Sequence, residues 1–247
     1  MLAALATQSP GWEEFKAYFF DWDKYRDSFP EIARAFLINV KIFVIAEAII
    51  LVTALLLAVL RSLRGPVFFP IRVLAIVYTD FFRGVPTILV ILMLGTGMPA
   101  LGVEGIPTSQ LFWAVVALVL VYTAYVSEVY RAGIESVHPS QEAAARSLGL
   151  THVQSLRYVV VPQAVRRVIP PLLNDFIGLQ KDTALISVLG VVEVLRQTQI
   201  DEAASFNGTY YLVAATLFLL VTIPLARLTD WLVERDRRRR QASGVAA

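Results

Sequence analysis

Polar side chains interrupt a hydrophobic stretch in the C-terminal half of the chain, in the sequence NDFIGLQKDTALIS (Asn174–Ser187). On a helix, Asn174 and Lys181 fall on nearly one line, because seven residues are close to two turns. Asp175 and Asp182 fall on a second line about 100° away, so the four residues form one polar stripe. Charges at membrane depth normally face a protein interior or a watery cavity. The polar stripe therefore indicates either a translocation path for a zwitterionic solute or an ion-pair network between packed helices.

A second polar group lies in DFFRGVP (Asp80–Pro86), inside another hydrophobic stretch. Pro86 removes a backbone hydrogen bond, and Gly84 permits close approach of a neighbouring helix. Broken spans often mark substrate sites in transporters, so Asp80 and Arg83 are further candidates for a translocation path. The alternative is a kink that serves packing, with Arg83 reaching the membrane interface.

The residues Ser140–Pro162, SQEAAARSLGLTHVQSLRYVVVP, form a polar segment between two apolar stretches. Ser140 can cap a first helix made mostly of strong helix formers, and Gly149 follows at the usual stop position. Thr151, with a glutamine three residues later, predicts a capping box for a second helix, and Pro162 is expected to end that helix. A helix–glycine–helix element beside a membrane domain is typical of a surface held by another protein.

The composition indicates a membrane protein and excludes several kinds of site. The chain has 247 residues, is 57% hydrophobic and has a mean hydropathy of +0.63. There is no cysteine, which excludes disulfides, thiolate metal sites and iron–sulfur clusters. The two histidines, His138 and His152, lack close acidic ligands, so no metal site is predicted. No phosphate-loop, GxGxxG or GxSxG motif occurs, so we expect no ATP hydrolysis and no catalytic residue in this chain.

Hydrophobic blocks of about 20 residues are long enough to cross a bilayer. The second and fourth predicted spans are the weaker ones, because both contain charges and prolines. The predicted spans are Ile38–Leu60, Ile71–Met98, Leu111–Tyr130, Val165–Val192 and Tyr210–Leu232. Residues 1–32, rich in aromatic and charged side chains, are expected to form an amphipathic interfacial segment, and residues 33–235 the transmembrane domain.

Basic residues gather in the loop after the first span, in the polar segment and in the tail, residues 236–247, which begins DRRRR. Residues 99–110 have neither Lys nor Arg, and residues 193–209 have only Arg196. The positive-inside rule then puts the N-terminus outside and the C-terminus in the cytoplasm. A basic tail in this position is expected to contact acidic membrane lipid rather than nucleic acid.

Together these motifs resemble the permease subunits of importer-type ABC transporters. The polar segment is similar to their cytoplasmic EAA loop, with Gly149 and Pro162 at the motif's spacing. EVYRAGIESV (Glu128–Val137), DFFRGVP and QKDTALIS are similar to elements of the polar amino-acid uptake branch, which includes histidine, glutamate, glutamine and arginine permeases. The likeness runs from about Ala33 to Arg235, most of the chain.

One position of the EAA loop departs from the family pattern. When Gly149 is aligned, Ala143 occupies the usual place of a glutamate, and Glu142 lies one position earlier, about 100° round the helix. The loop residues that the resemblance assigns to ATPase coupling are Ser140, Gln141, Glu142, Ala143, Ala144, Gly149 and Pro162.

The resemblance implies an all-α integral membrane protein of the type I importer permease fold, with about five transmembrane helices and a cytoplasmic coupling-helix loop. It implies a bacterial inner-membrane location, two separate ATP-binding subunits that hold ATP and Mg²⁺, a second permease chain and an extracytoplasmic amino-acid-binding protein. It assigns Lys181, Asp182 and Thr183 first to the solute cavity, ahead of Asp80 and Arg83. This chain itself is expected to hold no cofactor.

Two other classes of function compete with this interpretation. A gradient-driven secondary amino-acid carrier would use Glu47, Asp175 and Asp182 as proton or cation sites, but such carriers usually have more spans and internal repeats. A membrane anchor without transport would leave the charged stripe unexplained, because such charges are costly unless used or paired. The sequence leaves open which amino acid is carried.

Overall fold

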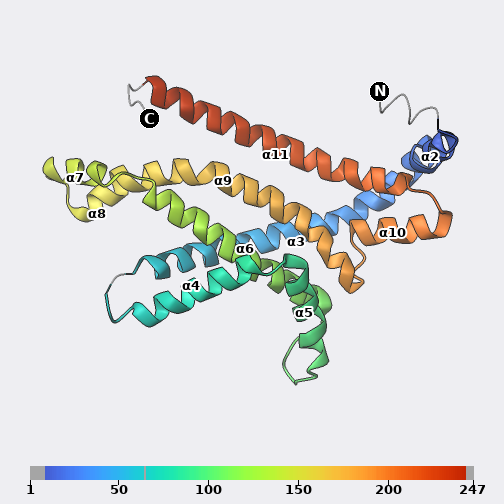
Figure 1. Ribbon diagram of the computed structural model, residues 1–247, viewed down its shortest axis with the longest axis horizontal. Coiled ribbons are helices and arrows are strands. Elements are labelled where there is room, and N and C mark those ends of the chain that lie inside the picture. Colours follow the sequence, from blue (N-terminus) through green and yellow to red (C-terminus); the bar gives the residue numbers. More distant parts are fainter. Residues whose placement is uncertain (1–8, 64, 243–247) are drawn as a thin grey trace.

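The computed structural model describes residues 9–63 and 65–242, and side chains as far as residue 238. The described residues form helices, turns and loops, with no strand among them (Figure 1). The α-helices are α2 (Trp12–Phe19), α3 (Trp22–Ser62), α4 (Phe69–Gly84), α5 (Thr87–Ala100), α6 (Gln110–Glu135), α7 (Pro139–Ser147), α8 (His152–Ser155), α9 (Val161–Asp182), α10 (Val194–Ser205) and α11 (Thr209–Ala242). A π-helical turn, Leu156–Val160, precedes α9, and a 3₁₀ segment, Thr183–Leu189, follows it.

Helix α6 lies at the centre of the main core, packed against α3, α5 and α9. Ala46, Ile50 and Ala54 lie one turn apart on α3 and are fully buried in this core. Alanines at this spacing let neighbouring helices approach closely. A second core joins α3 to α11, where the rings of Phe36 and Phe218 meet edge to face with their centroids 5.2 Å apart.

The predicted first span lies inside α3, a single helix of 41 residues. This helix begins at Trp22, where the Asp21 side chain caps it by accepting a hydrogen bond from the Lys24 amide at 3.1 Å. The helix continues across residue 32, so the expected interfacial segment consists of α2 and the first turns of α3. Residues 1–8 of that segment lie outside the described residues.

The predicted break in the second hydrophobic stretch is confirmed. Helices α4 and α5 meet at an angle of 102°, with Val85 and Pro86 between them. Val85 and Pro86 both have extended ψ angles, and the proline ring cannot continue the hydrogen-bond ladder of α4. The sequence element DFFRGVP therefore turns the chain sharply in the middle of a hydrophobic stretch.

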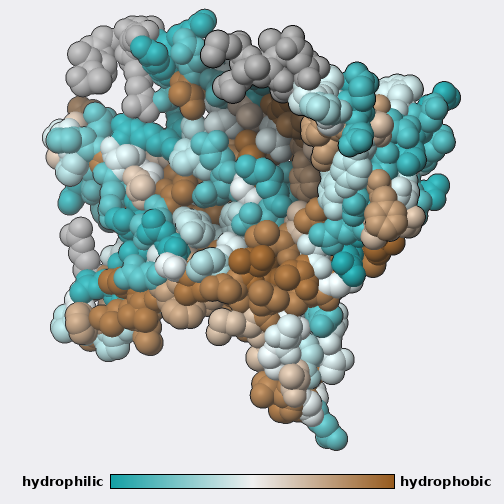
Figure 2. All heavy atoms as spheres, turned by 45° about the vertical axis from the view of Figure 1, so that its right-hand side comes forward, coloured by the Kyte–Doolittle hydropathy of each residue, from teal (hydrophilic) through white to brown (hydrophobic). Residues whose placement is uncertain are grey.

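Three stretches among the described residues are helical, long and apolar enough to cross a membrane: Trp12–Ser62, Gln110–Glu135 and Thr209–Arg238. The bent pair α4 and α5 counts as a fourth if it is one span. Figure 2 shows hydrophobic side chains as a continuous brown band across the lower half of its face. Large apolar side chains such as Val52 and Leu220 are exposed, as expected of a surface that meets lipid.

The fourth predicted span, Val165–Val192, is not one continuous α-helix. Helix α9 ends at Asp182, the 3₁₀ segment follows, and Gly190 turns the chain with a φ of +80°. Helix α9 is not among the three apolar helices, since it carries Arg166, Arg167 and the polar stripe. Helix α11 continues to Ala242, so the predicted basic tail begins inside this helix, and residues 243–247 lie outside the described residues.

The polar segment folds into two helices joined at a glycine, as predicted, but two of its expected boundaries are wrong. His138, not Ser140, caps α7: its Nδ1 accepts from the Ser140 amide at 3.2 Å, and Pro139 occupies the first turn. Pro162 does not end the second helix, because α8 continues through the π-helical turn into α9. Pro162 lies in the first turn of α9, where its missing N–H is tolerated.

The other local signals of the polar segment are confirmed. Gly149 has a φ of +89°, the left-handed conformation that glycine adopts after a helix. Thr151 and Gln154 form the capping box: the Thr151 amide donates to Gln154 Oε1 at 2.9 Å, and the Gln154 amide donates to Thr151 Oγ1 at 3.3 Å. In Figure 1, α7 and α8 lie at the same end of the long axis as the end of α11, while α2 and α10 lie at the opposite end.

Candidate functional site

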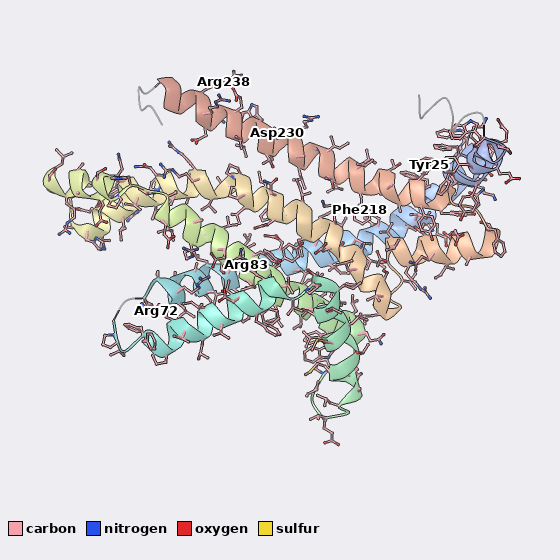
Figure 3. The ribbon with its side chains drawn as sticks, in the orientation of Figure 1. Tyr25, Arg72, Arg83, Phe218, Asp230 and Arg238 are labelled. Atoms are coloured by element: carbon pink, nitrogen blue, oxygen red, sulfur yellow. The ribbon has the colours of Figure 1, made fainter. Side chains whose placement is uncertain are left out.

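A cavity of about 380 Å³ lies between α4, α6 and α9. Its lining includes two cationic and two anionic side chains: Arg83 of α4, Glu128 of α6, and Arg167 and Asp175 of α9. Figure 3 labels Arg83 near the middle of the molecule, where the end of α4 passes α6. A cavity of this size with separate cationic and anionic groups suits a small zwitterion.

The charged groups of the cavity are mostly held by neighbours. The Arg83 guanidinium lies over the ring of Tyr125, 5.9 Å from its centroid, and the Tyr125 hydroxyl donates to the Arg83 carbonyl at 3.4 Å. Glu128 forms ion pairs with Arg61 at the end of α3 and, at 2.6 Å, with Arg131. These contacts connect the broken span to α6 and α3.

Asp175 is the exception, because its Oδ2 atom is buried with no hydrogen-bond partner among the described residues. Glu47 of α3, whose residue is 7% exposed, likewise has one buried oxygen, Oε1, without such a partner. Buried carboxylate oxygens are normally satisfied, so an unpartnered one beside a cavity is available to a solute N–H group or to water.

The residues of the polar stripe, Asn174–Asp182, lie in two different environments. Asn174 and Lys181 are exposed, whereas Asp175 and Asp182 are turned toward the protein. The Asp182 carboxylate accepts a hydrogen bond from the Tyr122 hydroxyl of α6 at 3.0 Å. Within the described part of the chain, none of the charged stripe residues forms an ion pair, so an ion-pair network inside this chain does not explain the stripe.

Of the sequence-predicted path residues, Arg83 and Asp175 meet at the cavity, although 92 positions separate them in the chain. Asp80, Asn174 and Lys181 are exposed on their helices and do not line it. Asp182 lies two turns beyond Asp175, about 10 Å further along α9.

Thr183 is fully buried, away from the cavity, in a network that sequence reasoning missed. Its hydroxyl donates to the Gln180 carbonyl at 2.7 Å and accepts from Asn39 Nδ2 at 3.1 Å. Asn39 also donates to Glu193 Oε2 at 2.8 Å, and Glu193 caps α10 by accepting from the Arg196 amide at 2.9 Å. This network holds the end of α9 and the start of α10 against α3.

Glu128 and Arg167 are the two charged cavity residues that sequence reasoning did not assign to the path. Glu128 lies inside a predicted span, and a charge in such a place is itself a signal of a functional or paired group. Arg167 is held against the end of α6, because its guanidinium donates to the Ser136 carbonyl. Gly133 also brings α6 and α9 together: a Cβ atom there would overlap the Val168 side chain.

In the polar segment, Glu142 faces inward. Its Oε1 lies 2.7 Å from His152 Nδ1, a hydrogen bond in which the carboxylate accepts, and its backbone carbonyl accepts from Ser155 Oγ at 3.5 Å. Gln163 Nε2 donates to Gln141 Oε1 at 3.4 Å, which connects α7 to the start of α9. Ala143 and Ala144 are exposed, and the space around Gly149 is open.

These features define an integral membrane protein in which one pair of helices, α6 and α9, joins a charged cavity to a folded polar segment. The chain belongs to the family described as the binding-protein-dependent transport system inner membrane component, which matches residues 50–238. The family assignment confirms the resemblance inferred from the motifs, and this chain is a permease subunit.

Two relatives are similar over nearly their whole length. The probable amino-acid permease protein YxeN of Bacillus subtilis is 35% identical over 213 residues, covering 85% of this chain and 93% of the relative. The glutamate/aspartate import permease protein GltK of Escherichia coli is 32% identical over 224 residues, covering 88% of this chain and 99% of the relative.

The fold is also that of a solved transporter. The crystal structure of an amino acid ABC transporter with histidines matches with a TM-score of 0.77 and 30% sequence identity, covering 87% of this chain and 98% of that one. The match confirms the predicted all-α, type I ABC importer permease fold.

Proposed function

We propose that this chain is the membrane-spanning subunit of an ATP-driven importer of polar amino acids. The observation that carries the proposal is the continuity of α9. Its first turn contains the end of the polar segment, its second half contributes Asp175 to the cavity, and its last turn holds Asp182 beyond the cavity. A displacement of the polar segment would therefore be transmitted to the cavity through one helix and its partner α6. The names of the two relatives, an amino-acid permease and a glutamate/aspartate permease, support the solute class.

In this proposal ATP and Mg²⁺ bind to two separate ATP-binding subunits, and the polar segment is the coupling loop that contacts one of them. ATP binding closes the two subunits, and the polar segment moves α6 and α9 so that the cavity changes from facing inward to facing outward. An extracytoplasmic binding protein then releases the amino acid into the cavity. In this proposal the chain itself translocates the amino acid, and ATP is hydrolysed on the partner subunits.

A second permease chain, identical or related, would complete the translocation path. Asp80, Arg83, Asn174 and Lys181 are exposed in the single chain, although they lie inside the second and fourth predicted spans. Charges that face lipid are costly, so we expect a second permease to cover this face. The polar segment and the end of α11 share one end of the molecule, which supports an N-terminus outside, a C-terminus in the cytoplasm and a basic tail near acidic lipid (Figure 1).

The solute is expected to place its carboxylate near Arg83 or Arg167 and its ammonium group near Asp175. The test is reconstitution in liposomes with the ATP-binding subunit encoded beside this chain and the matching binding protein. Uptake of labelled glutamate, glutamine, arginine, histidine and cystine is measured with ATP, and ATP hydrolysis is measured with each solute. The control is an ATP-binding subunit whose phosphate-loop lysine is replaced by alanine.

ATP-dependent uptake that is lost with the control subunit is the expected result. Uptake that persists without the ATP-binding subunit and collapses with an uncoupler would overturn the proposal. That outcome would favour the gradient-driven carrier, with Glu47, Asp175 and Asp182 as cation sites.

A further inference from the structure

Two buried carboxylates from different helices lie within electrostatic reach of each other. Glu47 is on α3 and Asp175 is on α9, and the two helices pack together. Phe43 lies one turn before Glu47, and Phe176 follows Asp175 in the chain. The two rings meet edge to face, with their centroids 6.4 Å apart. The negative charge of Asp175 therefore acts on Glu47 across the contact between α3 and α9.

Both carboxylates have a buried oxygen that accepts no hydrogen bond from the described residues: Oε1 of Glu47 and Oδ2 of Asp175. Glu47 as a whole is 7% exposed. Glu193, which is fully buried, shows how this fold holds an ionised carboxylate: it accepts from the Asn39 side chain and from two backbone N–H groups. Glu47 lacks such donors, so its ionised form is costly.

The surrounding groups do not neutralise this pair. Within the described part of the chain, Asp175 forms no ion pair, and the cavity cations are held elsewhere, by the Tyr125 ring and the Ser136 carbonyl. The charged groups of α10 bond to their own helix or to α2, and the first charged residues of α11, Arg227 and Asp230, are exposed. The titratable and charged groups that face the pair or share its cavity are Tyr122, Glu128 and Tyr130 of α6, Arg83 of α4 and Arg167 of α9.

The chemistry of the pair suits a proton better than a metal ion. Hard metal cations take several oxygen ligands, and the residues that the structure describes contain no group of three acidic or histidine side chains able to hold one. A proton needs a single carboxylate oxygen. Two carboxylates that share a site resist ionising together, so one of them retains its proton.

We infer that Glu47 and Asp175 hold one proton between them while the cavity is empty, and that the ammonium group of the solute displaces this proton. The inference rests on the proposed function, since it names what the ammonium group meets at Asp175. Before loading, the pair carries one proton and one negative charge. After loading, both carboxylates are ionised beside the ammonium group, and the proton has passed to water. Acidification should therefore weaken solute binding.

Infrared difference spectroscopy tests for the proton directly. The complete complex of permease and ATP-binding subunits is measured in lipid at neutral pH without solute, as wild type and as Glu47→Gln. We expect the difference spectrum to contain the C=O stretch of a protonated carboxyl, which shifts in heavy water. Glu193→Gln is the matched control, because Glu193 is equally buried but well supplied with donors, and it should remove carboxylate bands instead. A Glu47→Gln difference that contains carboxylate bands alone would overturn the inference.

Asp175→Asn tests whether the proton is shared. The asparagine amide removes the like charge and offers Glu47 a donor, so the protonated-carboxyl band should be lost in this variant too. A band of unchanged intensity in Asp175→Asn would show that Glu47 holds the proton independently of Asp175, and the pair would be wrongly assigned.

Displacement by the solute is tested by the pH profile of ATP-dependent uptake at limiting solute. Wild-type uptake should fall on acidification by up to about tenfold per pH unit, the limit for one proton that competes with one ammonium group. Glu47→Gln cannot titrate and should show a shallower profile. The same binding protein and ATP-binding subunits serve both chains, so their own pH dependence cancels in the ratio of the two rates. A ratio that is constant from mildly alkaline to mildly acidic pH would contradict displacement, as would complete loss of uptake by a Glu47→Gln complex that still hydrolyses ATP.

The two proposals fail in different ways. Uptake that requires a proton gradient and not ATP contradicts the proposed function, whatever the infrared spectrum shows. Uptake that requires ATP and resists an uncoupler, in a complex without the protonated-carboxyl band, contradicts the inference alone.

Discussion

The hydroxyl of Tyr122 donates a hydrogen bond to Oδ2 of Asp182 across 3.0 Å, which ties the middle of α6 to the last turn of α9. The same two helices carry Glu128 and Asp175 to the cavity. The C-terminal end of α6 leads into the polar segment, and the N-terminal end of α9 follows from it. The bond therefore stabilises the helix pair on which the proposed coupling depends. It also orients the one stripe carboxylate that lies beyond the cavity.

Tyr122→Phe removes the donor from a partly buried carboxylate, and we expect a loss of about 1–3 kcal/mol in the free energy of unfolding. Asp182→Asn keeps an acceptor oxygen for Tyr122 and should unfold at nearly the wild-type temperature. If the charge of Asp182 attracts the solute, Asp182→Asn will nevertheless reduce uptake. Thermal unfolding in detergent and uptake in proteoliposomes separate the two effects, and wild-type uptake by Asp182→Asn would exclude a solute role for its charge.

Gly149→Asp should abolish uptake while the protein still inserts in the membrane. Its φ of +89° strains any residue with a Cβ atom, at a cost of about 1–2 kcal/mol, and the new charge enters the turn between α7 and α8. Gly149→Asn is the matched control, because asparagine tolerates this conformation better and adds no charge. Normal uptake by Gly149→Asp would show that the turn between α7 and α8 is not needed for coupling.

Gly133→Ala is expected to separate α6 from α9, because the added methyl group overlaps the Val168 side chain. Overpacking of this kind typically costs about 1–3 kcal/mol. The second substitution Val168→Ala makes room and should recover most of the lost thermal stability and uptake, as coupled neighbours do in a double-mutant cycle. Additive losses in the double variant would contradict the close approach of the two helices.

Asp201 of α10 makes a pH-dependent contribution that can be measured apart from transport. Burial raises the pKa of its carboxyl, and the nearby charge of Glu31 adds to the rise, while Gln197 donates to Oδ1 at 2.9 Å. A raised pKa in the folded state means that the folded protein binds the proton more tightly than the unfolded chain. Stability is therefore lost as the pH rises through the folded-state pKa.

Asp201→Asn removes this charge, so it should raise the unfolding temperature at pH 8, and the difference from wild type should shrink as the pH falls below the usual aspartate range. Asp230→Asn on α11 serves as a control, because Asp230 is well exposed and its variant should show little change at either pH. A stabilisation by Asp201→Asn that is equal at low and high pH would contradict the burial of a charged carboxyl.

The sequence by itself determined the helical elements, the break at DFFRGVP, the capping box at Thr151, the glycine stop at Gly149 and the family. These features are local, since periodicity, caps and turn residues act within one or two turns of the chain. Local rules also produced the two wrong boundaries. A serine is an ordinary cap and a proline an ordinary stop, but His138 precedes a proline that begins α7, and Pro162 fits the first turn of α9.

Only the tertiary structure decided which polar groups meet. Arg83 joins Asp175 at the cavity, Thr183 is locked by Asn39 instead of lining a path, and Glu142 is turned toward His152. Helical spacing predicts the face of the helix on which a side chain lies. Which helix packs against that face depends on how helices distant in sequence cross. Side-chain packing over the whole bundle decides those crossings. For that reason the sequence indicated the stripe and the polar segment, and the packing of α3, α6 and α9 decided what each residue in them contacts.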